Sequence, residues 1–161
     1  MPEDDDELAN LKRELSIRFE MKDLGEVQRF LSMEIEHGFD GVRTPTIKFH
    51  QADYILTLLQ RHAMGDCNTV STQIDPSVNL TTTTDTDVKV DSSHHQQNVR
   101  ELMFAAIATR PDIMFTVSRL SSFNSNPCQR HLATVKHVLR YLKGIIIFQY
   151  LQETKGNVWP S

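Results

Sequence analysis

The sequence predicts an α+β fold in which a helix and a β-hairpin precede a mainly helical second half. Apolar residues recur at helical spacing from Glu7 to Met21, and they alternate with polar residues over residues 31–36, as in a half-buried strand. Pro111 and Pro127 then divide residues 94–151 into three helical segments. A length of 161 residues with 39% hydrophobic residues suits one globular domain.

The elements of the first half follow from spacing and turn residues. The apolar face of the first helix consists of Leu8, Leu11, Leu15 and Phe19. The strand over residues 31–36 should turn at Gly38 to Gly41 and return as a partner strand over residues 46–49. A second amphipathic helix is expected from Gln51 to His62.

Residues 76–94 differ in composition from what surrounds them. They are rich in Thr, Asp and Ser, hold few large apolar residues and include four consecutive threonines from Thr81. Such a segment buries too little apolar surface to fold by itself. We therefore expect a mobile linker here, with His94-His95 as a solvated pair at its end.

Two prolines set the helix boundaries of the second half. The residue before a proline avoids the helical region, so Thr109-Arg110 should be a break and Pro111 the first turn of a new helix. Asn126 should cap a third helix that has Pro127 at its first position. The predicted core faces are Val99, Leu102, Ala106 and Ile107; Ile113, Val117 and Leu120; and Leu132, Val135, Leu139 and Leu142.

Charge is divided unevenly along the chain. The net charge is −9 up to His95 and +5 from Gln96 onward, which together give −4. Lys136, Arg140 and Lys143 share one face of the third helix, which is either a solvated surface or a contact for phosphates. The basic second half gives weak support to the phosphate contact.

Neither membrane insertion nor secretion is expected. No apolar run reaches the roughly 18 residues of a membrane span, and the acidic start of the chain is the opposite of a signal peptide. Two cysteines make no disulfide framework. We expect an intracellular protein, cytoplasmic or nuclear, without a membrane partner.

Several motifs in the second half occur in a fixed order. They are Ala108-Thr109-Arg110-Pro111-Asp112-Ile113, Val117-Ser118-Arg119-Leu120-Ser121, Asn126-Pro127 and Leu139-Arg140-Tyr141-Leu142-Lys143-Gly144. In this order and spacing they closely resemble the polymerase of copia-type long-terminal-repeat retrotransposons. The resemblance extends from about Leu11 to Leu151.

The resemblance implies a division of the chain. Residues 1–75 would be the end of a reverse-transcriptase palm with a primer-grip-like hairpin, and residues 95–127 the helices of the thumb. Residues 128–161 would begin the connection or ribonuclease H region and be truncated. The implied nucleic-acid-binding residues are Phe30, Leu31, Ser32 and Met33 of the grip, Gln96 and Arg100 of the thumb, and Lys136, Arg140 and Lys143.

Arg100 is the most informative departure from the family pattern, because the family has glycine at that position. A mid-helix glycine is costly, and in reverse transcriptases at large the minor groove of the template–primer duplex comes close there. Arg100 either adds a charged contact or holds the duplex away, and close packing favours the second. Other departures are Ser32 for a glycine that would allow close approach, His50 for a capping serine, and Gln73, His95 and, in an expected strand, Gln149.

The complete family enzyme copies RNA into DNA with magnesium held by clustered carboxylates, including a Tyr-x-Asp-Asp turn. This sequence has no such turn, and the ribonuclease H carboxylates should begin beyond Leu151. We therefore expect no catalytic residue, metal or cofactor in this chain, inactivity alone, and at most weak binding of an RNA–DNA template–primer duplex.

Two other functions stay open. The chain could be a helical interaction piece that assembles with another polymerase chain, or an inert, partly folded gene remnant. Cys128 and His131 have a spacing found in zinc sites but offer only two ligands, so zinc is disfavoured.

Overall fold

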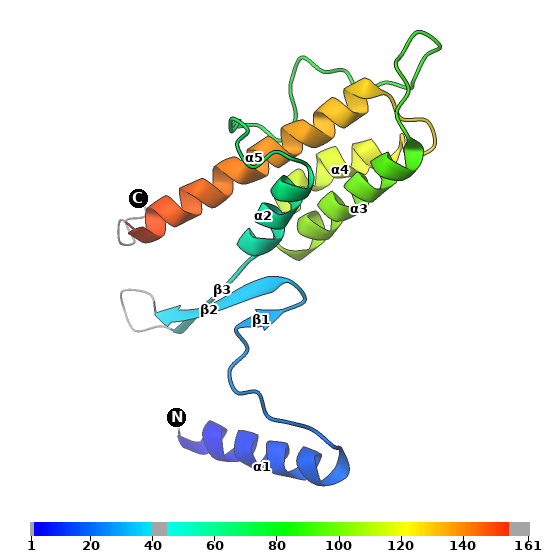
Figure 1. Ribbon diagram of the computed structural model, residues 1–161. Coiled ribbons are helices and arrows are strands. Elements are labelled where there is room, and N and C mark those ends of the chain that lie inside the picture. Colours follow the sequence, from blue (N-terminus) through cyan, green and yellow to red (C-terminus); the bar gives the residue numbers. More distant parts are fainter. Residues whose placement is uncertain (1, 40–44, 155–161) are drawn as a thin grey trace.

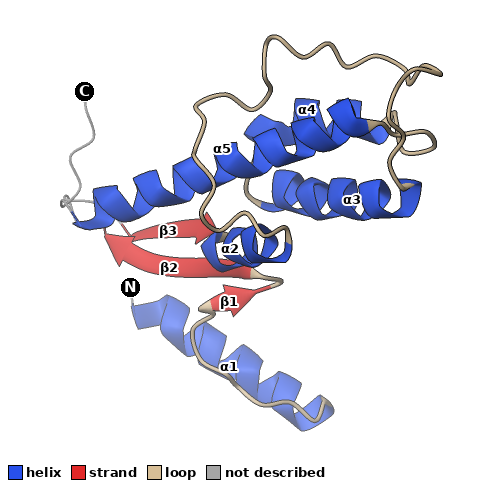
Figure 2. Ribbon diagram, turned by 45° about the horizontal axis from the view of Figure 1, so that its top comes forward, coloured by secondary structure: helices blue, strands red, loops and turns tan. Residues whose placement is uncertain are grey.

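The computed structural model describes residues 2–39 and 45–154 as a mixed α+β fold, as the sequence predicts. A small sheet lies between the first helix, α1 (Pro2–Arg18), and a helical part (Figures 1 and 2). The helical part contains α2 (Ala52–Arg61), α3 (Ser92–Ala108), the 3-10 helix η1 (Pro111–Ile113), α4 (Met114–Ser121) and α5 (Gln129–Thr154). None of the helices in these described ranges is long and apolar enough to cross a membrane.

The sheet is antiparallel in the order β1-β2-β3, with β1 at Arg29–Phe30, β2 at Met33–Phe39 and β3 at Pro45–His50. The predicted hairpin is confirmed as β2 and β3. The predicted turn at Gly38 is wrong, because Gly38 pairs with Thr46 and the ladder continues to Phe39. Gly41 lies outside the described residues.

The sheet has one polar and one apolar face. Register places Glu34 opposite His50 on the polar face and Ile35 opposite Phe49 on the other. The apolar face is open, since Phe49 is 57% exposed.

Helix α1 is shorter at its end than predicted, stopping at Arg18 and not at Met21. The chain turns back there, and Asp23 forms an ion pair with Lys12 at 2.9 Å. The apolar side chains of α1 stay exposed. They are Leu8, Leu11, Leu15, Ile17 and, just beyond the helix, Phe19. The predicted apolar stripe therefore exists on α1, but within the described residues nothing buries it.

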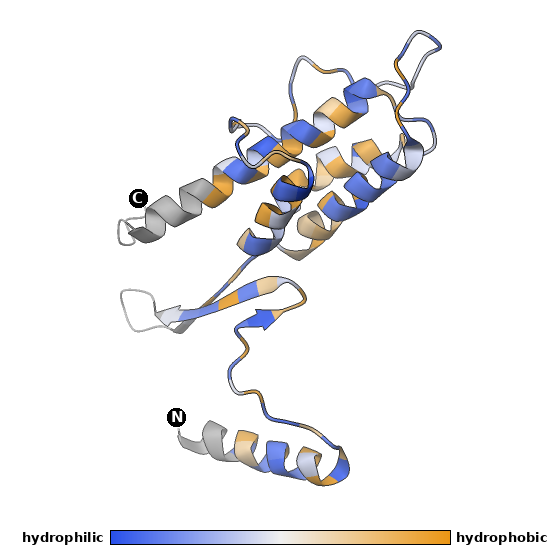
Figure 3. Cartoon of the chain, in the orientation of Figure 1, coloured by the Kyte–Doolittle hydropathy of each residue, from blue (hydrophilic) through white to orange (hydrophobic). Residues whose placement is uncertain are grey.

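The core lies among α2, α3, α4 and α5. Hydrophobic and hydrophilic residues alternate along each of these helices (Figure 3). The predicted faces are confirmed for most positions, including Val99, Leu102, Ala106, Ile113, Val117, Leu120, Val135, Leu139 and Leu142, all buried. The prediction that Ile107 belongs to the core face is wrong, because Ile107 is 71% exposed while Ala105 is buried. One helical step of about 100° separates Ala106 from Ile107 and turns the latter outward.

The break at Thr109-Arg110 is confirmed, since α3 ends at Ala108 and η1 begins at Pro111. The third helix starts later than predicted, at Gln129. The chain just before it forms a bridge with the preceding segment, because Val90 N donates to Pro127 O at 3.1 Å and Gln129 N donates to Val88 O at 2.9 Å. α5 continues through Gln149, where a strand was expected.

The prediction of a solvated His94-His95 pair is wrong for His95, whereas His94 is exposed. Asp91 caps α3 by accepting a hydrogen bond from His94 N at 2.9 Å, so both histidines are helical. His95 is completely buried, and its Nε2 lies 3.2 Å from the carbonyl oxygen of Leu120. The cap at Asp91 starts the helix about one turn before the start that the sequence predicts, at Gln96, and this decides the outcome.

The Thr-rich segment before α3 contains no helix or named strand, but it contacts the start of α5. Leu80 is buried, Thr83 Oγ1 donates to Asn126 O at 2.5 Å, and Arg130 pairs with Asp87. These contacts attach the Thr-rich segment to the start of α5, whereas its composition alone predicts a mobile linker. The division of the chain into palm, linker, thumb and connection stays a prediction.

Candidate nucleic-acid interface

The predicted grip residues form a tight turn between β1 and β2. Phe30 pairs with Met33, and the two residues between them, Leu31 and Ser32, have φ angles of 49° and 60°. Two positive φ values in a two-residue loop define a type I′ turn, which favours glycine or asparagine. Phe30 and Leu31 are 57% and 66% exposed. The resemblance implies glycine at position 32. The positive φ of the turn gives a local reason for glycine there, in addition to the close approach of a ligand.

Replacing Ser32 by glycine should stabilise the turn by about 0.5–1 kcal/mol, because glycine reaches positive φ without steric strain. Amide hydrogen exchange at Met33 and at Ile35, whose N–H donates to Gln28 O at 2.9 Å, measures this local stability. Ser32→Ala, which keeps the steric penalty, is the matched control and should show no gain. Equal protection in all three proteins would contradict this explanation.

Gln96, Arg100 and Phe104 lie at intervals of one helical turn on α3, and all three are exposed. We call them the α3 stripe. Gln96 Nε2 donates to Asn124 O at 3.1 Å, and Phe104 packs edge-on against Tyr54 with ring centroids 5.1 Å apart. Among the described residues, no hydrogen bond or ion pair engages Arg100.

The first turn of α2 contacts both parts of the predicted interface. Asp53 pairs with Arg29 of β1 at 2.6 Å. Tyr54 donates to Glu101 O of α3 at 3.0 Å, next to its contact with Phe104. The structure therefore connects the 30–33 turn and the α3 stripe through a single helix, which periodicity alone could not indicate.

The basic residues of α5 are placed differently. Lys136 is exposed. Arg140 Nε donates to Asn68 O at 2.7 Å, and Lys143 Nζ donates to Gly65 O at 2.6 Å and Cys67 O at 2.9 Å. Two of the three cations thus bind backbone carbonyls in the segment that follows α2.

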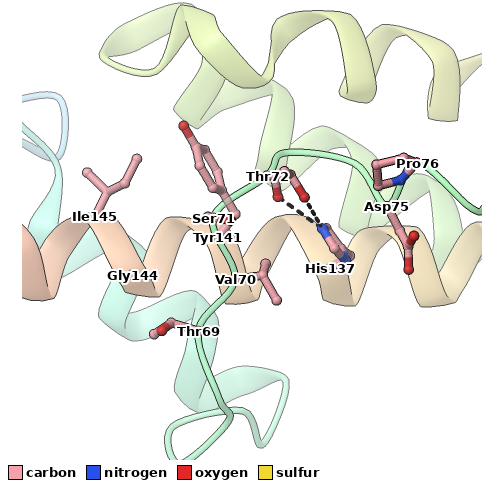
Figure 4. Close-up of a pocket in the computed structure, with 10 residues that line it drawn as sticks. All are labelled: Thr69, Val70, Ser71, Thr72, Asp75, Pro76, His137, Tyr141, Gly144 and Ile145. Atoms are coloured by element: carbon pink, nitrogen blue, oxygen red, sulfur yellow. Dashed lines mark hydrogen bonds between the residues drawn. The ribbon is translucent and has the colours of Figure 1, made fainter.

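Residues 69–72, 75 and 76 line a shallow groove together with α5 (Figure 4). His137 Nε2 lies 2.9 Å from Thr72 O and 3.2 Å from Thr72 Oγ1. A Cβ on Gly144 would lie 3.3 Å from Cβ of Thr69, so the segment crosses α5 closely at this glycine. The Leu139–Gly144 motif therefore has a packing role in the structure.

The Thr-Arg-Pro-Asp motif joins η1 to α5. Arg110 donates two hydrogen bonds to Asp112, at 2.9 and 2.5 Å, and Tyr141 donates a third at 2.8 Å. Burial works to raise the pKa of Asp112, but these hydrogen bonds outweigh it and the pKa is lowered. Burial, together with this carboxylate, raises the pKa of Tyr141. Gln73, one of the departures from the family pattern, donates to Tyr141 at 3.2 Å.

Glu101 connects α3 to the end of α2 and has no signal in the sequence. It pairs with Arg61, and its carboxylate lies 3.3 Å from His62 Nε2 and 3.2 Å from Gln97 Nε2. Burial acts to raise its pKa, but hydrogen bonds from Gln97, His62 and Arg61 lower it overall. The Glu101 carboxylate therefore stays charged and keeps α2 against α3.

Cys128 and His131 do contact each other, at the start of α5. His131 Nδ1 accepts a hydrogen bond from Cys128 N at 3.0 Å, and Cys128 O accepts from Leu132 N at 3.3 Å. The bond from Cys128 N to His131 is one half of a capping box, with histidine at the third helical position. The described residues contain no group of three or more His, Cys, Asp or Glu that could hold a metal ion.

The comparisons with known proteins agree with the family that the motifs indicate. Residues 1–76 match the family model described as reverse transcriptase (RNA-dependent DNA polymerase). The chain is 36% identical over 145 residues to the retrovirus-related Pol polyprotein from transposon TNT 1-94 of Nicotiana tabacum. It is 38% identical over 138 residues to that from transposon RE1 of Arabidopsis thaliana, and 35% over 132 residues to a putative transposon Ty5-1 protein of Saccharomyces cerevisiae.

These matches cover 85%, 85% and 82% of this chain, but 10%, 9% and 41% of the respective relatives. No solved structure matches the chain. The chain belongs to the reverse transcriptases. Within that class it belongs with the copia-type retrotransposon Pol polyproteins, of which it spans about a tenth of the length in the first two relatives. The resemblance stated from the motifs is thereby confirmed.

Proposed function

We propose that this chain contacts an RNA–DNA template–primer duplex as part of a copia-type reverse transcriptase. The observation that carries the proposal is the α3 stripe, an exposed face of α3 on which Arg100 has no hydrogen-bond or ion-pair partner among the described residues. The exposed 30–33 turn is a second contact region. Asp53 and Tyr54 of α2 connect it to the α3 stripe. Binding should be weak and only modestly salt-dependent, because few cations are available for phosphates.

Lys136 is the third contact that we propose, since it is exposed on α5. Arg140 and Lys143 already donate to backbone carbonyls, so their contribution to phosphate binding should be smaller. We propose magnesium as a cofactor of the complete enzyme only. The described residues offer no set of three ligands for it, and we assign no metal-dependent step to this chain.

Replacing Arg100 by glycine should tighten duplex binding, because the long side chain holds the shallow groove of the duplex away from α3. Fluorescence anisotropy with a labelled RNA–DNA duplex over a salt series measures this, and we expect about a fivefold lower dissociation constant. Arg100→Ala should show a smaller gain without the glycine's loss of about 1 kcal/mol in helix stability. Lys136→Ala is the control for charge and should weaken binding.

The opposite result has an equally clear meaning. If Arg100→Gly and Arg100→Ala both bind more weakly, with a salt dependence reduced by about one ion, the arginine contacts phosphate. No binding by any of these proteins, at concentrations where all are folded, would overturn the proposed function.

A second function, assembly with another polymerase chain, is favoured by the open apolar surfaces of the first half. Leu8, Leu11, Ile47 and Phe49 are each more than half exposed. Assembly through them predicts a cooperative thermal transition whose midpoint rises with protein concentration. Dye binding with no such dependence would instead indicate the partly folded remnant.

A further inference from the structure

The junction between the sheet and the helical part is short and closely held. β3 ends at His50 and α2 begins at Ala52, so one residue, Gln51, separates strand from helix. Gln51 is only 2% exposed. A single buried residue leaves little freedom for the hairpin to rotate against α2.

Gln51 also connects this junction to the end of α3. Its Oε1 accepts a hydrogen bond from Thr109 Oγ1 at 2.9 Å, whereas its buried Nε2 has no partner among the described residues. A buried amide with an unpaired N–H is destabilising relative to an apolar side chain of similar size. The specific contribution of glutamine here is therefore the bond to Thr109.

Tyr54, three residues further on, makes the second connection to α3. Its hydroxyl donates to Glu101 O at 3.0 Å, and its ring meets Phe104 edge-on at an interplanar angle of 74°. Phe104 is a member of the α3 stripe, so the position of Tyr54 directly affects that surface. Gln51 and Tyr54 thus hold α3 at two points from the first turn of α2.

We propose that Gln51 and Tyr54 are positioning residues that set the orientation of the 30–33 turn relative to the α3 stripe, an inference that rests on the proposed duplex binding. The Arg29–Asp53 pair completes the connection on the hairpin side. Both side chains act on the duplex through the two surfaces that they align. Neither side chain is proposed to touch nucleic acid.

A distance measurement tests the alignment without nucleic acid. Spin labels at Ser32→Cys and Ser93→Cys, in a Cys67→Ser background, report the separation of the turn and the exposed start of α3. Cys128 is 1% exposed and should stay unlabelled. We expect one narrow distance distribution in the parent protein and clear broadening with Gln51→Ala or Tyr54→Phe.

Two further variants keep the test decisive. Thr109→Val removes only the donor to Gln51 at nearly constant volume. This variant replaces Gln51→Ala in the test if Gln51→Ala does not fold. Gln60→Ala, exposed on the same helix, is the matched control and should leave the distribution unchanged. Unlabelled Tyr54→Phe and Thr109→Val should each bind the duplex about fivefold more weakly, the equivalent of one neutral hydrogen bond.

The outcomes separate this inference from the proposed function. An unchanged distribution in Gln51→Ala, Thr109→Val and Tyr54→Phe overturns the inference, whatever the affinity. Broadening with unchanged affinity also overturns it, since alignment would then not matter for binding. If the parent protein binds no duplex, the proposed function fails, and the distance distributions alone decide whether these residues align the two surfaces.

Discussion

Replacing His131 by alanine is expected to lower the free energy of unfolding by about 3 kcal/mol. The imidazole is completely buried and stacks on Phe123 with ring centroids 4.1 Å apart. Its Nδ1 accepts from Cys128 N, so Nε2 carries the proton and donates to Thr81 O at 3.1 Å. Alanine would leave a cavity, an uncapped helix start and an unpaired carbonyl together.

Urea denaturation of the variant measures this loss. Lys136→Ala, exposed one turn later on the same helix, should change the free energy of unfolding by less than about 0.5 kcal/mol. A loss below about 1 kcal/mol for His131→Ala would mean that these contacts are not formed in solution. The same variant should also make residues 80–90 more accessible to protease, because His131 holds Thr81.

Folding stability should fall as the pH drops from about 7.5 toward 5, and two buried histidines cause this. Burial lowers the pKa of His95 and of His131, in each case more than the nearby carbonyl oxygen raises it. Below the unfolded-state pKa of about 6.5, the unfolded chain therefore binds more protons than the folded chain. The stabilisation is complete above that pH and is lost as pH falls toward the lower folded-state pKa values.

His95→Phe isolates one of the two contributions. His95 Nδ1 is buried without a partner among the described residues, and Leu120 O keeps a second donor in Phe123 N at 3.1 Å. The variant should be more stable by about 1 kcal/mol at pH 7.5, and its advantage should grow at pH 5. Denaturant midpoints of both proteins across this range give the difference curve. A difference that does not depend on pH would contradict the assignment of His95.

The carboxylates with lowered pKa act in a lower pH window. Asp112 and Glu101 favour the folded state when charged, so their contribution is present above about pH 4.5 and is lost below it. Variation between pH 7.5 and 5 is therefore assigned to the histidines.

Features that depend on neighbouring residues could be predicted from the sequence. The break before Pro111, the β2–β3 pairing and the core face of Ile113, Val117 and Leu120 follow from fixed proline geometry and from apolar spacing. The motifs alone also led to the copia-type reverse transcriptases. The Leu31-Ser32 turn carried no such signal, since neither residue prefers positive φ.

The candidate interface shows the same division between what the sequence predicts and what the tertiary structure decides. The sequence by itself determined that Gln96, Arg100 and Phe104 share one side of a helix, because a period of 3.6 residues requires it. Only the tertiary structure decided that His95 is buried, that Arg140 and Lys143 hold backbone carbonyls, and that α2 connects the turn to the stripe. The partners in these contacts lie far apart in the chain, and a side chain's type does not reveal which distant carbonyl or ring will meet it.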